Sequence, residues 1–187
     1  MSTRVTLLCH AATAATGRAA FPLDEPITAH GRAAAERLAP PVGGKLLRVV
    51  RGPELRCAQT SVAIGLVDAL IEPALRDCDH GTWAGRTLDE VLAADPAGVA
   101  AWLAEPEATP HDGESLASVL DRSASWLDEQ ARGGHGRVVA ITHSIVARAV
   151  AVHALRGAVE VFWHLDVGPL GRVDLSRNGA RWALRLR

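Results

Sequence analysis

Short apolar runs alternate with amphipathic stretches along this chain. The runs at Arg4–Cys9, Leu46–Val50 and Arg137–Thr142 are rich in Val, Leu and Ile, which is typical of buried strands. Amphipathic helical spacing is clearest at Glu114–Arg132, where apolar residues recur on one face. This alternation predicts an α/β three-layer sandwich, with a mostly parallel central sheet and helices on both faces.

Turn and capping signals place the remaining elements. A short third strand is expected at Ala74–Cys78, and loops are expected at Ala11–Glu25 and Glu105–Gly113. Further helices are expected from Thr28 to Leu38 (stopped by Pro40-Pro41), from Gly52-Pro53 to about Val67, from a capping box at Thr87–Glu90, from Asp95-Pro96, and from Ser144 to Leu155. Gly133-Gly134 is expected to end the helix at Glu114–Arg132. The segments Leu170–Leu175 and Trp182–Arg187 flank Asn178-Gly179, which predicts a C-terminal antiparallel hairpin.

The length of 187 residues favours one domain over residues 1–187, and the 48% of hydrophobic residues is enough for a sizeable core. A net charge of −1 gives no general basic field, so neither nucleic acid nor a membrane is expected as a partner. Residues 1–10 are too short and too quickly polar for a signal peptide, which favours a cytoplasmic location. The three cysteines (Cys9, Cys57, Cys78) form no CxxC pair, so neither a disulfide framework nor a zinc site is expected.

Candidate chemistry follows the predicted strands. His10 and His143 each come directly after an apolar strand, and Arg56 lies one helical turn into the segment after the second strand. Asp77 lies at the end of the expected third strand. The carboxyl ends of parallel strands gather functional groups, so these four side chains are expected to meet in one pocket. A phosphate dianion suits this set, because guanidinium and imidazolium groups bind its oxygens, a neutral imidazole attacks phosphorus, and a carboxylic acid protonates the departing oxygen.

The motifs along nearly the whole chain resemble the histidine phosphatase superfamily, in its phosphoglycerate-mutase-like branch. That family has Arg-His-Gly-x-Thr, then Ser-Pro-x-x-Arg-x-x-Gln-Thr, then Leu-x-Glu-x-x-x-Gly-x-Trp-x-Gly, then Gly-Glu-Ser, and finally a strand followed by Thr/Ser-His. The matching segments, in the same order, are Cys9–Thr13, Gly52–Thr60, Leu75–Gly85, Gly113–Ser115 and Thr142-His143.

The resemblance implies a role for each matching residue. His10 matches the nucleophile that forms a phosphohistidine, and His143 matches the histidine that binds the phosphoryl group. Asp77 matches the general acid and base, which is Glu in most of the branch. The residues that match or adjoin phosphate-binding positions are Arg56, Thr13, Thr16 and Ser144. The implied activity is hydrolysis of a small phosphate monoester, by a phosphatase rather than a mutase, with no metal or organic cofactor.

Three positions depart from the family pattern. Cys9 stands where the family has its first arginine, which removes a fixed charge and a bidentate donor, a loss that can cost about 10²–10³ in rate. Ala11 replaces a glycine, and Asp77 is one methylene shorter than Glu. Two explanations stay open: the protein is a weakened or non-catalytic relative, or Arg51 or Arg18 supplies the missing charge.

Other interpretations also stay open. Cys9 is a small buried hydrophobe or a reactive thiol, and His111 lies at the pocket mouth or in solvent. His80 falls at an aromatic position of the family, which favours a place in the pocket wall. The rival functions are a phosphate-ligand-binding or regulatory module, and an enzyme that uses the two histidines for non-phosphoryl chemistry. The tail hairpin presents a sheet edge, which makes a homodimer a further expectation.

Overall fold

The fold is described from a computed structural model over residues 3–38, 47–133 and 136–186. Four sequence signals therefore lie outside the described residues: the Pro40-Pro41 stop, the strand start at Leu46, the Gly134 helix end, and the hairpin end at Arg187.

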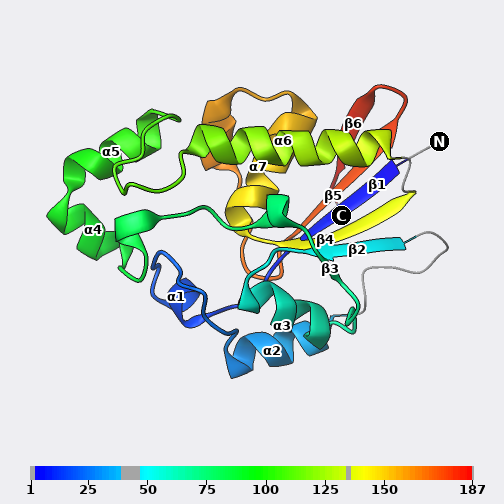
Figure 1. The fold of residues 1–187 in the computed structure, drawn as a ribbon, viewed down its shortest axis with the longest axis horizontal. Coiled ribbons are helices and arrows are strands. Elements are labelled where there is room, and N and C mark those ends of the chain that lie inside the picture. The colour runs from blue at the N-terminus through cyan, green and yellow to red at the C-terminus, as the bar shows by residue number, and fades with distance from the viewer. Residues whose placement is uncertain (1–2, 39–46, 134–135, 187) are drawn as a thin grey trace.

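A six-stranded sheet forms the centre of the molecule (Figure 1). Its strands are β1 (Thr3–Cys9), β2 (Leu47–Arg51), β3 (Leu70–Ile71), β4 (Arg137–Thr142), β5 (Arg172–Asn178) and β6 (Arg181–Arg185). Their order is β3-β2-β4-β1-β5-β6, in which the first four strands are parallel and β5 and β6 are antiparallel. The mostly parallel sheet and the C-terminal antiparallel hairpin expected from the sequence are thus confirmed.

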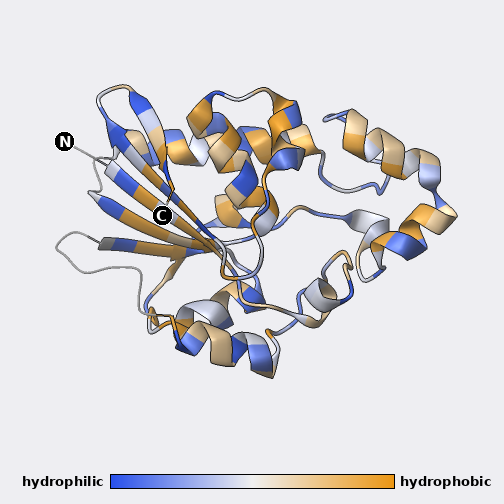
Figure 2. Cartoon of the chain, turned by 180° about the vertical axis from the view of Figure 1, so that it is seen from behind, coloured by the Kyte–Doolittle hydropathy of each residue, from blue (hydrophilic) through white to orange (hydrophobic). Residues whose placement is uncertain are grey.

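Helices cover both faces of this sheet (Figure 1). The helices α6 (Leu116–Arg132) and α7 (Ser144–Leu155) pack on one face, where Val5 and Leu7 of β1 join their core. The helices α2 (Ala29–Glu36) and α3 (Leu55–Ala63) lie on the other face, where Leu8 joins a second core. Alternate residues of a strand point to opposite faces, so an apolar run in β1 serves both cores. Apolar residues run along the strands in Figure 2.

A smaller helical part lies beyond the carboxyl ends of the parallel strands. It contains α4 (Leu88–Ala94), α5 (Pro96–Ala104) and the 3₁₀ helix η2 (Gly81–Trp83), at the far end of the molecule from the hairpin in Figure 1. Phe21, Trp83, Val91 and Val99 form its core, and Trp102 packs against them. This part borders the site described below.

The expected third strand at Ala74–Cys78 is wrong. Pro73–Leu75 forms a 3₁₀ helix (η1), because Pro73 fits its first turn and the side chain of Glu72 accepts a hydrogen bond from the backbone of Ala74. The true third strand, β3, comes a few residues earlier and pairs with Val50 and Arg51 of β2.

Two further boundaries differ from expectation. The loop Ala11–Glu25 contains a short helix, α1 (Ala14–Gly17), because Thr13 and Thr16 form a capping box at its start. The helix expected over Gly52–Val67 is shorter, as α3 begins at Leu55 and ends at Ala63. Another 3₁₀ helix, η3 (Val159–His164), follows α7.

None of the helices over the described ranges combines the length and apolarity that a membrane span requires. The strand β6 occupies one edge of the sheet. The homodimer expected from this edge stays a prediction.

Candidate active site

His10 stands at the carboxyl end of β1, where its backbone N–H continues the ladder by donating to the Thr142 carbonyl at 2.9 Å. Its ring atom Nδ1 lies 2.8 Å from the Ala11 carbonyl, which only accepts, so Nδ1 carries the proton and Nε2 keeps its lone pair. Burial, together with the nearby His143, lowers the pKa of His10 to about 4. The ring is therefore neutral at physiological pH.

His143 occupies the N-cap of α7 and is almost fully buried. Its ring meets the ring of His10 edge to face, with 5.2 Å between centroids. Burial alone would lower the pKa of His143, but the charge of Asp77, helped by Cys57, raises it well above its usual value. Oδ2 of Asp77 lies 3.2 Å from its Nδ1. One neutral and one protonated imidazole therefore lie side by side.

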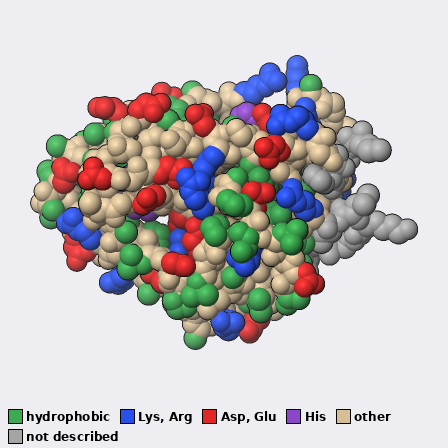
Figure 3. All heavy atoms as spheres, in the orientation of Figure 1, with side chains coloured by type: hydrophobic (Ala, Val, Ile, Leu, Met, Phe, Trp, Pro, Cys, Tyr) green, Lys and Arg blue, Asp and Glu red, His purple; other side chains and the backbone are tan. Residues whose placement is uncertain are grey.

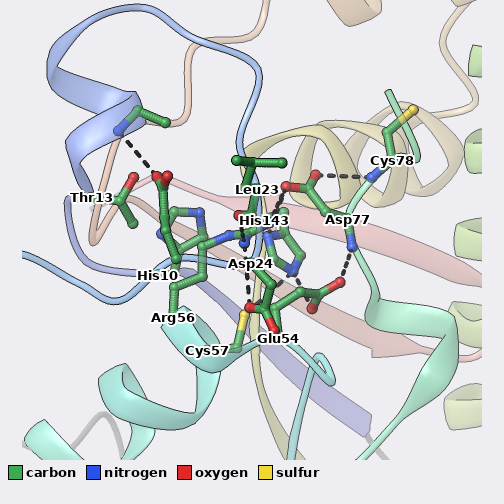
Figure 4. A network of polar contacts seen from close by, with 12 residues as sticks. His10, Thr13, Leu23, Asp24, Glu54, Arg56, Cys57, Asp77, Cys78 and His143 are labelled. Carbon is green, nitrogen blue, oxygen red and sulfur yellow. Dashed lines mark hydrogen bonds and ion pairs between the residues drawn. The ribbon is translucent and has the colours of Figure 1, made fainter. Parts of the chain in front are cut away.

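Glu54 is a site residue that the sequence analysis missed. Its Oε2 lies 2.8 Å from Nε2 of His143, and its Oε1 accepts a hydrogen bond from the backbone N–H of Asp77 at 2.8 Å (Figure 4). The carboxylate reaches this place because Gly52 has no side chain: a Cβ there would lie 2.8 Å from Oε2 of Glu54. The signal in the sequence was an acidic residue two positions after Gly52, which stands where the family has serine.

Arg56 and Asp77 form a buried ion pair. Nη2 of Arg56 donates to Oδ2 of Asp77 at 2.7 Å, and Nη1 donates to the Leu23 carbonyl at 2.8 Å (Figure 4). Only 2% of Arg56 is exposed, because the loop that carries Leu23 covers it. Burial alone would raise the pKa of Asp77, but the charges of His143 and Arg56 hold it well below its usual value.

The Asp77 segment is fixed from behind by α6. Arg122 donates to the carbonyls of Ala74 and Asp77 at 2.8 and 3.1 Å. Glu114, in the Gly-Glu-Ser segment that precedes the helix, pairs with both Arg122 and Arg76. These bonds keep the acid near the histidines although Asp77 is not in a strand.

A cavity of about 290 Å³ opens in front of the two histidines. A hollow is visible left of centre in the space-filling view (Figure 3). The expected site residues that line the cavity are His10, Asp77, His143, Thr13, Thr16 and Ser144, and His80 lies in its wall as expected. Its apolar wall includes Phe21, Ile145, Trp102, Phe162 and Trp163. Trp102, which packs against the core of the smaller helical part, is thus also a wall residue.

Five candidates do not line the cavity: Arg56, described above, and four others. Cys9 is 3% exposed and packs in the core with α7, and burial raises the pKa of its thiol to about 12, so a reactive thiolate is not expected. Nη1 of Arg51 donates to the Gly52 carbonyl at 2.9 Å, and Arg18 is an exposed residue at the end of α1. Neither arginine belongs to the cavity wall. His111 is fully buried against Trp83 rather than solvated.

Among the described residues, one group has ligand atoms placed to hold a metal ion. The ligand atoms of Glu54, Cys57 and His143 lie within 4.8 Å of one another. Here Nε2 of His143 instead contacts the Glu54 carboxylate and, at 3.4 Å, the sulfur of Cys57. The carboxylate of Asp77 at the other ring nitrogen would suit a metal-bound histidine equally well.

Several known proteins are similar to this chain in sequence or in fold. Phosphoserine phosphatase 1 of Hydrogenobacter thermophilus is 29% identical over 147 residues, which are 75% of this chain and 70% of that protein. Glucosyl-3-phosphoglycerate phosphatase of Mycolicibacterium vanbaalenii is 36% identical over 86 residues, 44% of this chain and 38% of that protein. The solved structure of a mycobacterial glucosyl-3-phosphoglycerate phosphatase with VO3 aligns with a TM-score of 0.83 at 25% identity, over 98% of this chain and 97% of that chain. The family model "Histidine phosphatase superfamily (branch 1)" matches residues 5–187, and the chain belongs to this family.

Proposed function

We propose that the protein is a phosphatase that hydrolyses a small phosphate monoester through a phosphohistidine at His10. The observation that carries this proposal is the 2.8 Å contact between Nδ1 of His10 and the Ala11 carbonyl. It leaves Nε2 as the nucleophilic atom, and the low pKa of the ring keeps that atom unprotonated. The phosphatase names of the relatives support the same reaction class.

In the first step, Nε2 of His10 attacks phosphorus, an N–P bond forms, and the P–O bond to the alcohol breaks. Negative charge on the phosphoryl oxygens is stabilised by the protonated ring of His143, whose Nδ1 faces Asp77 and whose side chain lines the cavity. In the second step, water attacks phosphorus, the N–P bond breaks, and inorganic phosphate leaves.

Asp77 would protonate the departing alcohol and then take a proton from the attacking water. Asp77 is ionised, because the positive charges of His143 and Arg56 hold its pKa well below the usual value. A phosphate dianion at the cavity-lining ring of His143 competes for that cation and adds a negative neighbour, and both effects raise the pKa of Asp77. Substrate binding thus prepares the acid for its role.

A second candidate function is a phosphate-ligand-binding module without turnover. One observation favours it: Arg56 is 2% exposed, and its terminal nitrogens are bonded to Leu23 and Asp77 rather than directed into the cavity. In this alternative the loop over Arg56 stays closed, and the phosphoryl group is bound without being transferred.

Hydrolysis of a panel of phosphate monoesters by the parent, His10→Ala and His30→Ala proteins tests the proposal. His30 is an exposed residue of α2, so His30→Ala is a matched control. We expect hydrolysis by the parent and by His30→Ala, and a loss of at least about 10³-fold in His10→Ala, because covalent catalysis at His10 is removed. Equal rates in all three proteins would contradict the proposal, and phosphate binding without hydrolysis by the parent would favour the binding module.

A further inference from the structure

Arg148 is a cation that the proposed mechanism does not yet use. It lies on α7 and lines the same cavity as His10 and His143. Its Nε is buried without a hydrogen-bond partner, and across residues 3–38, 47–133 and 136–186 its side chain joins no ion pair. A buried donor without a hydrogen-bond partner costs free energy. Such a group needs an explanation, and a ligand that accepts its hydrogen bond is one.

Ser144 provides a second unpaired group at the same wall. Its Oγ is buried without a partner and lines the cavity. Ser144 and Arg148 are four residues apart in α7, so their side chains lie on the same face of the helix. The helix begins directly after His143, and its first N–H groups are donors that favour an anion. The side chains of His143, Ser144 and Arg148, at the N-cap and in the first turns of α7, thus all line the cavity.

Arg148 also has a connection with residue 9, where Cys9 stands in place of the family's first arginine. The positive charge of Arg148 acts on the thiol of Cys9, which stands directly before His10 and packs against α7. The guanidinium also lies over the ring of Phe162, another residue of the cavity wall, 5.8 Å from its centroid. The helix against which Cys9 packs therefore carries a guanidinium that lines the cavity, although it comes from another element of the fold.

We propose that Arg148, together with Ser144, binds the phosphoryl oxygens of the substrate and supplies from α7 the guanidinium that Cys9 cannot. This proposal rests on the phosphatase function proposed above. Arg51 and Arg18 do not line the cavity, and Arg56 is bonded to Asp77 and Leu23. Burial lowers the pKa of Arg148, which the charge of Asp166 partly opposes, and a phosphate dianion in the cavity would offset the remaining cost of burying this charge.

Calorimetric binding of inorganic phosphate tests this proposal without turnover. Arg148→Met removes the charge and keeps most of the length, and Arg132→Met is the matched control on an exposed residue of α6. We expect phosphate to bind Arg148→Met about 10- to 100-fold more weakly than the parent, which is the range for a charge-assisted contact. Ser144→Ala should weaken binding several-fold, and Arg132→Met should bind phosphate like the parent.

Two results would overturn the proposal: phosphate binding by folded Arg148→Met as tight as by the parent, or no phosphate binding by the parent at millimolar concentration. Circular dichroism verifies folding. If Arg148→Met does not fold, Arg148→Lys decides, because it keeps the charge but not the bidentate fork. It should bind phosphate more weakly than the parent, and unchanged affinity would equally overturn the proposal.

The two proposals fail separately in this design. If the parent does not hydrolyse any phosphate monoester but its phosphate affinity depends on Arg148, the proposed phosphatase function is wrong and the proposed anion site is supported. If hydrolysis depends on His10 but phosphate affinity is unchanged by substitution of Arg148, the phosphatase function is supported and the proposed anion site is wrong.

Discussion

Glu54 holds the ring of His143 through a 2.8 Å contact between Oε2 and Nε2, while Asp77 lies at the other ring nitrogen. The interaction lowers the pKa of the Glu54 carboxyl although burial alone would raise it. A histidine between two carboxylates keeps both its orientation and its proton. Glu54 is therefore a positioning residue for His143.

Replacing Glu54 tests this relationship. We expect Glu54→Gln to lower the pKa of His143, because a neighbouring negative charge is lost, and to reduce kcat more than KM is raised. The unfolding free energy should fall by about 1–3 kcal/mol, the range for a partly buried charged hydrogen bond. Urea unfolding and NMR titration of the imidazole nitrogens measure these effects, with exposed Glu129→Gln as the control. An unchanged His143 titration would show that Glu54 has no such role.

The pKa values of the two active-site histidines should be shifted in opposite directions from the ordinary value. His10 should stay neutral until the pH approaches about 4, because it is buried beside His143. His143 should remain protonated well above pH 6.5, because Asp77 stabilises its charge. A pH titration of the parent followed by ¹⁵N NMR measures the pKa values of His10 and His143, and the variants His10→Gln and His143→Gln assign the two signals. Ordinary titration of both rings near pH 6.5 would refute this electrostatic picture.

Stability should decline in mild acid because of His10. Its pKa is about 4 in the folded state and 6.5 as a model value, so the unfolded chain binds more protons between these limits. The unfolding free energy should therefore fall from pH 6.5 to pH 4, by at most about 3 kcal/mol from this residue. His80 acts in the same direction. The unfolding free energy, measured with urea at several pH values, should depend less steeply on pH in His10→Gln than in the parent. An identical pH dependence in the two proteins would contradict this role of His10.

The role of Asp77 is testable through the leaving group. Asp77→Asn cannot donate a proton, so hydrolysis of alkyl phosphates should fall by about 10²–10⁴-fold. Esters with a good leaving group, such as p-nitrophenyl phosphate, should lose much less, because their phenolate departs without protonation. The ratio of the two rates separates acid catalysis from a general defect in folding. Equal losses for both substrates would argue against Asp77 as the acid.

Metal dependence is a further discriminating measurement. The proposed reaction uses side chains alone, so prolonged dialysis against EDTA should leave phosphatase activity unchanged. Loss of activity that added Zn²⁺ restores would place a metal at the group Glu54, Cys57 and His143. Cys57→Ser would then be expected to weaken the restoration.

Sequence patterning predicted the framework because the buried strands are dense in β-branched and aliphatic residues. It placed His10 and His143 correctly at the ends of β1 and β4, since each polar residue directly follows an apolar run. It failed at Ala74–Cys78, where local proline chemistry at Pro73 outweighed the apolar character of the segment.

The parts of the site that the sequence did not reveal depend on long-range packing. Glu54 reaches His143 across a gap of 89 residues, through space that Gly52 leaves free. Arg148 lies in a mostly apolar helix, and only the fold brings it to the cavity wall. Arg51, just before the Gly52-Pro53 turn, was a candidate for the missing charge, but its guanidinium donates a hydrogen bond to the backbone of Gly52.

Trapping the phosphorylated protein tests the central claim most directly. A phosphate monoester is mixed with the parent for milliseconds, quenched in alkali to preserve phosphohistidine, and mapped by peptide mass spectrometry. The account predicts one phosphoryl group on the peptide containing His10 and none in His10→Ala. Turnover of substrate by the parent with no phosphorylated His10 at any quench time, and unaltered turnover in His10→Ala, would contradict it.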